Sequence, residues 1–153
     1  MKSILLVEDF EDSRYMMRML LEMSGYRVLE AADGRRAVEL AREECPDLVL
    51  MDLSLPVLDG LSATREIRRM DNISNLPVIA LTAHGTEEFQ DAALTAGCDE
   101  FVTKPIDFDL LESVIREQLG KRGTRACGSV SPFMENTNRV SHLSHKPTRS
   151  PEY

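Results

Sequence analysis

Short apolar runs alternate with longer amphipathic segments along residues 1–119 of the chain. A continuous run of four or five apolar residues between polar segments is typical of a strand that is buried on both faces of a parallel sheet. The pattern predicts three such strands, over residues 3–7, 47–51 and 77–81, and two shorter strands, over residues 26–30 and 99–103.

Between these runs, apolar residues recur at helical spacing. Helices are expected before Gly25, around Ala37–Ala41, after Gly60, over 86–96 and over 107–119. The apolar stripe of the first helix consists of Tyr15, Met16, Met19, Leu20 and Met23. We expect this stripe to pack into the core, because methionine adapts to irregular packing, although such a stripe can also bind a partner. Alternating strands and helices imply right-handed crossovers and a parallel sheet. The predicted fold class is α/β, a doubly wound three-layer sandwich with five strands and five helices.

Charge and composition divide the chain into two parts. The formal net charge is -8, but residues 1–119 carry 24 acidic and 12 basic side chains, whereas residues 120–153 carry 2 acidic and 6 basic ones. After Gly120 the chain is rich in Gly, Ser, Thr, Asn, Pro and Arg and has no sustained apolar period. We therefore expect one domain over 1–119 and a disordered basic tail over 120–153. The acidic domain argues against direct DNA binding.

The cysteines and the N-terminal residues indicate the cellular compartment of the protein. The three cysteines, Cys45, Cys98 and Cys127, are not spaced as metal ligands, and their odd number leaves one unpaired in any disulfide scheme, which favours a reducing cytosol. The first apolar run is too short for a signal peptide or a membrane span. We expect a soluble, cytoplasmic protein that does not associate with membranes.

Acidic residues follow two of the predicted strands. Glu8 and Asp9 follow the first strand, and Asp52 ends the run that starts at Leu48. Because ligands of open α/β sheets bind outside the carboxyl ends of the strands, at least three carboxylates should lie close together. Crowded carboxylates must take up a proton or share a cation, and oxygen-only ligation favours Mg²⁺. Such a site suits phosphoryl transfer better than acyl or glycosyl chemistry.

Together, four sequence elements resemble the receiver domains of two-component response regulators, with the single-domain, chemotaxis-type members closest in length. The elements are Glu8–Asp9, the segment Met51–Gly60 around Asp52, Thr82–Ala83 and Lys104–Pro105. Each falls at the end of a predicted strand, and the resemblance covers about residues 2–119. It implies a flavodoxin-like sheet with strand order 2-1-3-4-5. Pro56 and Gly60 would shape the loop that follows Asp52.

The resemblance implies a phosphoacceptor and a metal site. Asp52 would attack the phosphoryl group carried by a histidine kinase or histidine phosphotransfer protein and become an aspartyl phosphate. Mg²⁺ would be bound by Asp9, Asp52, the backbone carbonyl of Ser54 and, directly or through water, Glu8. Members of the family more commonly have two aspartates at the first acidic element, so Glu8 is a variant of that pattern.

The remaining roles also come from the resemblance. Lys104 would pair with a phosphoryl oxygen, and the peptide bond from Lys104 to Pro105 would be cis. Thr82 would be the switch hydroxyl that turns toward the phosphoryl group, and Phe101 would be the aromatic side chain that moves inward with it. His84, like Ser54, would influence how fast the phosphoryl group is lost.

Three classes of function are compatible with an aspartyl phosphate. The leading interpretation is a phosphorylation-controlled binding module, not an enzyme, which presents the helix over 86–96, the strand over 99–103 and the helix over 107–119 to a downstream protein. A DNA-binding transcription regulator is disfavoured because the residues after Leu119 have no helix-turn-helix periodicity. A phosphatase of the haloacid-dehalogenase type is disfavoured because Ser54 stands where those enzymes have a second aspartate. The receiver fragment of a hybrid kinase is an alternative, although the initial Met1 favours a free-standing regulator.

Overall fold

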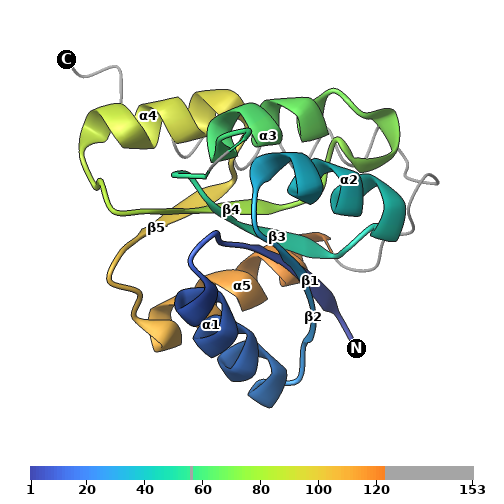
Figure 1. The fold of residues 1–153 in the computed structure, drawn as a ribbon, viewed down its shortest axis with the longest axis vertical. Helices are drawn as coiled ribbons and strands as arrows, with labels where there is room; N and C mark the ends of the chain where they lie inside the picture. The colour runs from blue at the N-terminus through green and yellow to red at the C-terminus, as the bar shows by residue number, and fades with distance from the viewer. Residues whose placement is uncertain (56, 123–153) are drawn as a thin grey trace.

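A computed structural model describes residues 1–55 and 57–122, which fold around a five-stranded parallel sheet with strand order β2-β1-β3-β4-β5 (Figure 1). The strands are β1 (Ser3–Val7), β2 (Arg27–Ala31), β3 (Leu48–Asp52), β4 (Val78–Thr82) and β5 (Glu100–Thr103). Each begins within one residue of its predicted position. The predicted fold class and strand order are confirmed.

Helices cover both faces of the sheet (Figure 1). They are α1 (Glu11–Met23), α2 (Gly34–Glu44), α3 (Gly60–Arg68), α4 (Glu87–Ala96) and α5 (Phe108–Arg122), with a short 3-10 helix, η1 (Asp71–Ile73), before β4. Helices α2, α3 and α4 lie on one face, and α1 and α5 lie on the other. Because α5 runs to Arg122, the first three residues of the predicted tail are helical. The rest of that tail and Pro56 lie outside the described residues.

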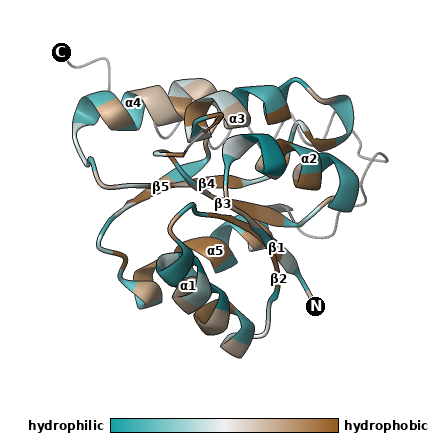
Figure 2. Cartoon of the chain, in the orientation of Figure 1, coloured by the Kyte–Doolittle hydropathy of each residue, from teal (hydrophilic) through white to brown (hydrophobic). Residues whose placement is uncertain are grey.

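The core consists of two apolar layers separated by the sheet, and Figure 2 shows the central strands β3 and β4 as largely hydrophobic. All residues of β1, β3 and β4 are buried. Successive side chains of a strand point to opposite faces, so Leu5 and Val49 pack toward α2 and α3, while Ile4 and Leu50 pack toward α1 and α5. This burial on both faces explains why β1, β3 and β4 consist mostly of consecutive apolar residues.

The exposed face of α1 contradicts the prediction that its methionine stripe packs into the core. Met16 is 59% exposed and Met23 is 79% exposed, with Tyr15 and Met19 also exposed. Leu21 is fully buried, and Met17 packs beside it against the α5 side of the sheet. Neighbouring helical residues point about 100° apart, and two apolar stripes run side by side along this helix, so the periodicity did not identify the buried one.

Strand register brings the carboxyl ends of four strands to one edge of the sheet. Val7 is paired with Met51, Asp52 with Leu81, and Thr82 with Thr103. The residues that follow β1 and β5 therefore lie beside the last residues of β3 and β4. In residues 1–55 and 57–122, no helix is both long and apolar enough to cross a membrane.

The connection from β3 to α3 is tightly packed against the end of β3. The Asp59 side chain caps α3 by accepting a hydrogen bond from the Ser62 amide at 2.9 Å. A Cβ atom at Gly60 would collide with the backbone carbonyl of Asp52, so only glycine lets α3 begin this close to the strand. The expected role of Gly60 at this turn thus has a steric basis.

Candidate functional site

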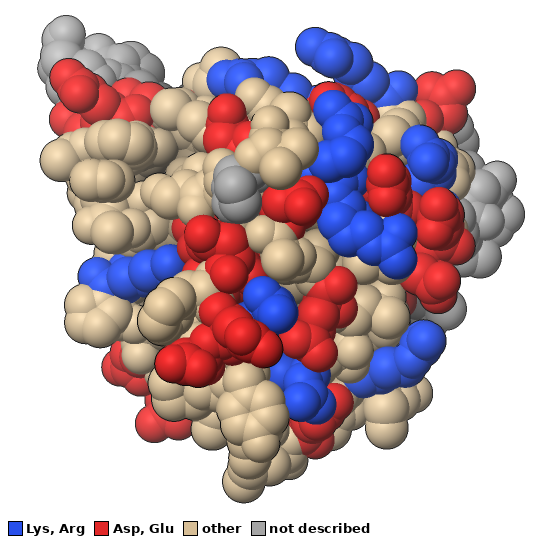
Figure 3. All heavy atoms as spheres, in the orientation of Figure 1, with Lys and Arg blue, Asp and Glu red and all other residues tan. Residues whose placement is uncertain are grey.

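Three carboxylates meet at the carboxyl edge of the sheet. One oxygen each from Glu8, Asp9 and Asp52 lies within 4.8 Å of the other two. Asp52 is 3% exposed and Glu8 is 6% exposed, whereas Asp9 is exposed. Figure 3 shows acidic side chains gathered in the middle of the face that it displays, with basic ones between them. The acidic cluster expected from the two strand ends is therefore present.

Both carboxylate oxygens of Asp52 are held by hydrogen bonds. The Ser54 amide donates to Oδ1 at 2.9 Å, and the Lys104 ammonium donates to Oδ2 at 2.9 Å. The first bond folds the chain after β3 back onto the carboxylate, and the second brings a charge from the end of β5. The Asp52 carboxylate is thus oriented by its own loop and paired with a cation.

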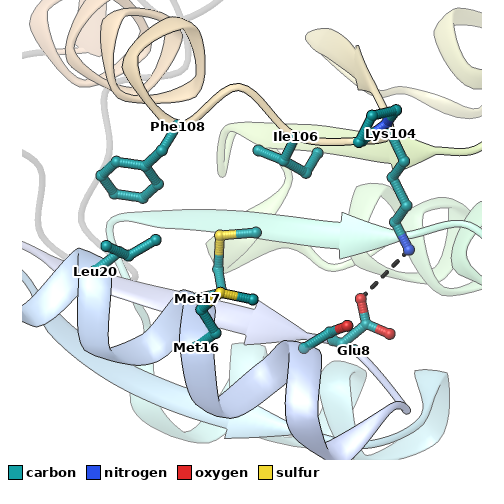
Figure 4. Close-up of a pocket in the computed structure, with 9 residues that line it drawn as sticks. Glu8, Met16, Met17, Leu20, Lys104, Ile106 and Phe108 are labelled. Carbon is teal, nitrogen blue, oxygen red and sulfur yellow. Dashed lines mark hydrogen bonds and ion pairs between the residues drawn. The ribbon is translucent and has the colours of Figure 1, made fainter.

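Glu8 is fixed by a second set of contacts. Its Oε2 accepts a hydrogen bond from the Phe10 amide at 3.1 Å, and its Oε1 lies 3.4 Å from the Lys104 ammonium (Figure 4). Arg14, on α1, donates to the Glu8 backbone carbonyl at 2.9 Å and pairs with Glu30 at 3.1 Å. Sequence reasoning missed Arg14, because its contacts depend on how α1 packs beside β2.

The electrostatics of the site follow from burial and charge. Burial raises the pKa of Glu8, and the negative charge of Asp52 adds to this, against the opposing effects of the Phe10 amide and Lys104. Partial burial would lower the pKa of Lys104, but its hydrogen bond to Asp52 and the charges of Asp52 and Glu8 outweigh burial and raise it. The carboxylates therefore repel one another, and a cation stabilises them.

The donor atoms fit a hard divalent cation. Glu8, Asp9 and Asp52 offer only oxygen, at separations that one ion can bridge. The exposed position of Asp9 leaves a side open to water, which Mg²⁺ retains in such sites. The backbone carbonyl of Ser54 stays a predicted ligand, although its amide holds the loop against Asp52.

The predicted switch residues lie on neighbouring strands. Thr82 is 3% exposed at the end of β4, and its hydroxyl bonds with the backbone of His84, accepting from the amide at 3.0 Å and donating to the carbonyl at 3.3 Å. Phe101 is paired with Ala80, two residues before Thr82, so the side chains of Thr82 and Phe101 are both on the α4 side of the sheet. The peptide bond from Lys104 to Pro105 is cis, as the resemblance implied.

A cavity of about 350 Å³ opens beside the acidic cluster. Glu8 and Lys104 lie at one end, and the walls come from α1, from the loop between β5 and α5 and from the start of α5. The lining residues include Met16, Met17, Leu20, Ile106 and Phe108 (Figure 4). The exposed methionine stripe of α1 thus borders the site. The abundance of methionine was the sequence signal for this surface.

The sequence matches proteins of a known family. The family model of the response regulator receiver domain matches residues 4–116. The polar-differentiation response regulator DivK of Brucella anthropi is 37% identical over 119 residues, which is 78% of this chain and 97% of that protein. DivK of Brucella ovis is 36% identical over 119 residues, with the same coverage.

Two solved structures extend the similarity to the fold. The receiver domain of the sensor histidine kinase PA1611 of Pseudomonas aeruginosa, with a magnesium ion coordinated in its active-site cleft, superposes with a TM-score of 0.74 and 40% identity, covering 78% of this chain and 98% of that one. The chemotaxis protein CheY4 of Vibrio cholerae has a TM-score of 0.73 and 26% identity, covering 77% of this chain and 98% of that one. The chain therefore belongs to the response regulator receiver domain family, the signalling domains of two-component systems.

Proposed function

We propose that Asp52 accepts a phosphoryl group from a histidine kinase or a histidine phosphotransfer protein. The observation that carries the proposal is the position of Asp52, a buried carboxylate within a triple acidic cluster and 2.9 Å from the Lys104 ammonium. A carboxylate oxygen forms a bond to phosphorus as the bond from phosphorus to the donor histidine nitrogen breaks, and the histidine keeps the electron pair. The product is an aspartyl phosphate.

The residues around Asp52 have separate tasks in this transfer. The Ser54 amide holds Oδ1, which leaves Oδ2 to be presented to the donor once Lys104 exchanges its partner for a phosphoryl oxygen. Glu8, Asp9, Asp52 and the Ser54 carbonyl would hold Mg²⁺. Bound Mg²⁺ supplies charge neutralisation for the incoming phosphoryl oxygens.

The switch starts from a hydroxyl that is already bonded. Thr82 would leave the backbone of His84 and turn toward the phosphoryl group, and Phe101 would move inward on the neighbouring strand. A single phosphoryl group can change the dominant conformation only if the two states lie within a few kcal/mol of each other. A phosphoryl oxygen could accept the proton that the Thr82 hydroxyl now donates to the His84 carbonyl at 3.3 Å, so this hydrogen bond would be exchanged rather than lost.

Two surfaces would serve two classes of partner. The apolar face of α1 suits the phosphodonor, because Met16 lines the cavity beside the acidic site, Met19 is also exposed, and exposed apolar patches mark interaction sites. The face formed by α4, β5 and α5 would bind the downstream protein, and it exposes Phe89 and Leu110. A surface for each partner lets the donor and the target be different proteins.

The output is protein binding in the cytoplasm rather than catalysis. Ser54 follows Asp52 at the position where a phosphatase of the haloacid-dehalogenase type would need a general acid, so only slow loss of phosphate is expected. The net negative charge of residues 1–119 does not favour direct DNA binding. The likeness to the receiver of PA1611 favours a second arrangement, in which the same chemistry serves a receiver joined to a kinase.

Intact-protein mass spectrometry tests the proposal directly. The protein is incubated with acetyl phosphate and Mg²⁺, beside Asp52→Asn and a metal-free sample. Asp59→Asn is the matched control, because it makes the same chemical change in the next loop and asparagine retains the helix cap. Addition of one phosphoryl group that requires both Asp52 and Mg²⁺ supports the proposal. An adduct that persists in Asp52→Asn, or its absence from the folded wild type, refutes it.

A further inference from the structure

We propose that His84 and Phe89 couple Thr82 to α4, so that a change at the phosphoacceptor site moves this helix. The inference rests on the proposed function, because the change at Thr82 is the response to a phosphoryl group at Asp52. It adds a route out of the site that differs from the movement of Phe101. His84 is a positioning residue in this route, and Phe89 is the point at which the helix receives the movement.

The first link is the pair of hydrogen bonds between Thr82 and His84. The Thr82 hydroxyl accepts from the His84 amide at 3.0 Å and donates to the His84 carbonyl at 3.3 Å. A hydroxyl has one proton to donate, so Thr82 cannot donate to a phosphoryl oxygen while it donates to this carbonyl. Movement of Thr82 toward Asp52 therefore releases or drags the backbone at His84.

The second link is the ring contact between His84 and α4. The imidazole stacks on the Phe89 ring, with the ring centroids 4.5 Å apart and the planes 15° apart. This separation is within the range of favourable aromatic contacts. Because Phe89 lies in the first turn of α4, displacement of the His84 backbone is transmitted to the start of the helix.

Two further contacts make the loop and the first turn of α4 one unit. The Gln90 side chain donates to the Gly85 carbonyl at 3.4 Å, and the Thr86 hydroxyl accepts from the Phe89 amide at 3.5 Å. The residues of α4 that are buried are two alanines, Ala93 and Ala96. Small side chains anchor a helix weakly, so α4 can follow the loop at low energetic cost.

The experiment compares the response of α4 in matched variants. Amide NMR shifts of α4 are measured as Mg²⁺ and beryllofluoride, a phosphoryl mimic, are added to the full chain. Phe89→Ala removes the ring and keeps a good helix former, Phe89→Tyr keeps the ring, and Asp91→Asn is the control on an exposed α4 side chain. Gln90→Ala tests the loop contact independently. The fluorine signal of bound beryllofluoride reports occupancy in each sample.

The proposal expects bound beryllofluoride in every variant and a selective loss of the α4 response. The shift changes of Ala92 and Ala93 should fall to below about half in Phe89→Ala and in part in Gln90→Ala, and stay at wild-type size in Phe89→Tyr and Asp91→Asn. Full shift changes in Phe89→Ala at equal occupancy would overturn the coupling and leave the phosphoacceptor proposal intact. Failure of the wild type to bind beryllofluoride would overturn both.

Discussion

Replacement of Asp9 by asparagine should make the protein more stable than the wild type without magnesium and less stable than the wild type with magnesium. Asp9 contributes one of three carboxylate oxygens that lie within 4.8 Å of one another. At about 4.8 Å, two unit charges repel by roughly 0.9 kcal/mol in a water-like dielectric. Because Asp9 is exposed, this value applies rather than the larger interior one. Without metal, Asp9→Asn should therefore be more stable than the wild type by about 1 kcal/mol.

Magnesium should invert this difference. A ligand that binds the native state stabilises it by about 2.7 kcal/mol when its concentration is about 100 times its Kd. For a domain of this size, 1 kcal/mol corresponds to roughly 3–6 °C in Tm, so the wild type should melt roughly 10 °C higher with magnesium. The amide of Asp9→Asn is a neutral and weaker ligand for Mg²⁺, so the variant should lose most of this gain.

Thermal melting followed by circular dichroism measures both effects. Magnesium is titrated at constant ionic strength, so that general screening does not mimic binding. Asp59→Asn is the control, because this exposed acid lies outside the cluster and should respond to magnesium as the wild type does. A metal-free Asp9→Asn that melts below the wild type and gains as much from magnesium would refute both the repulsion and the metal site.

Further outcomes concern Lys104, Glu8, Cys98 and Met16. Without metal, Lys104→Met should lower the free energy of unfolding, measured in urea, by about 2 kcal/mol, because two buried carboxylates lose the ammonium that pairs with them. Unchanged stability would contradict the ion pairs. Mg²⁺ affinity, measured by calorimetry, should weaken with falling pH from above 4.5, because the raised pKa of Glu8 lets protons compete early. In the metal-free protein, Glu8 should stabilise the fold at low pH. This contribution is fully present below pH 4.5 and is lost as pH rises through the raised pKa of folded Glu8, so a melting temperature that does not change over this range would contradict it. In the native protein, Cys98 should resist iodoacetamide at about pH 8 and react in urea, because burial raises the pKa of its thiol to about 11. Rapid labelling of native Cys98, detected by peptide mass mapping, would contradict this. Met16→Gln should slow phosphoryl transfer from a protein donor about fivefold and leave transfer from acetyl phosphate unchanged, with Met23→Gln as the control; equal slowing with both donors would argue against a docking surface.

The sequence predicts those parts of the fold in which a residue pattern is compatible with only one degree of burial. The runs Ile4–Val7 and Leu48–Met51 are apolar at every position, so only burial on both faces suits them. Acidic residues directly after such runs must lie at the carboxyl edge, whatever the details of the helices. The acidic cluster could therefore be predicted before any side chain was placed.

The parts that the sequence does not predict depend on a choice between similar alternatives or on contacts that are distant in sequence. In α1, Met16 and Met17 are neighbours of the same type, and only packing decides that the second faces the core. The contacts of Arg14 with Glu8 and Glu30 join a helix to two strand ends, and no local spacing encodes them. Such contacts require the tertiary arrangement to be known.

The charge balance of the site bears on whether the proposed phosphorylation of Asp52 would need a metal ion. Three carboxylates and the Lys104 ammonium leave two negative charges at the edge of the sheet. A phosphoryl group is itself anionic, so its approach to Asp52 would be repelled. A divalent cation would cancel those two charges, and in the proposed function Lys104 would then be free to pair with the phosphoryl oxygens and Thr82 could turn toward them. The same acidic residues that make the metal-free site unfavourable would therefore make phosphorylation depend on the metal.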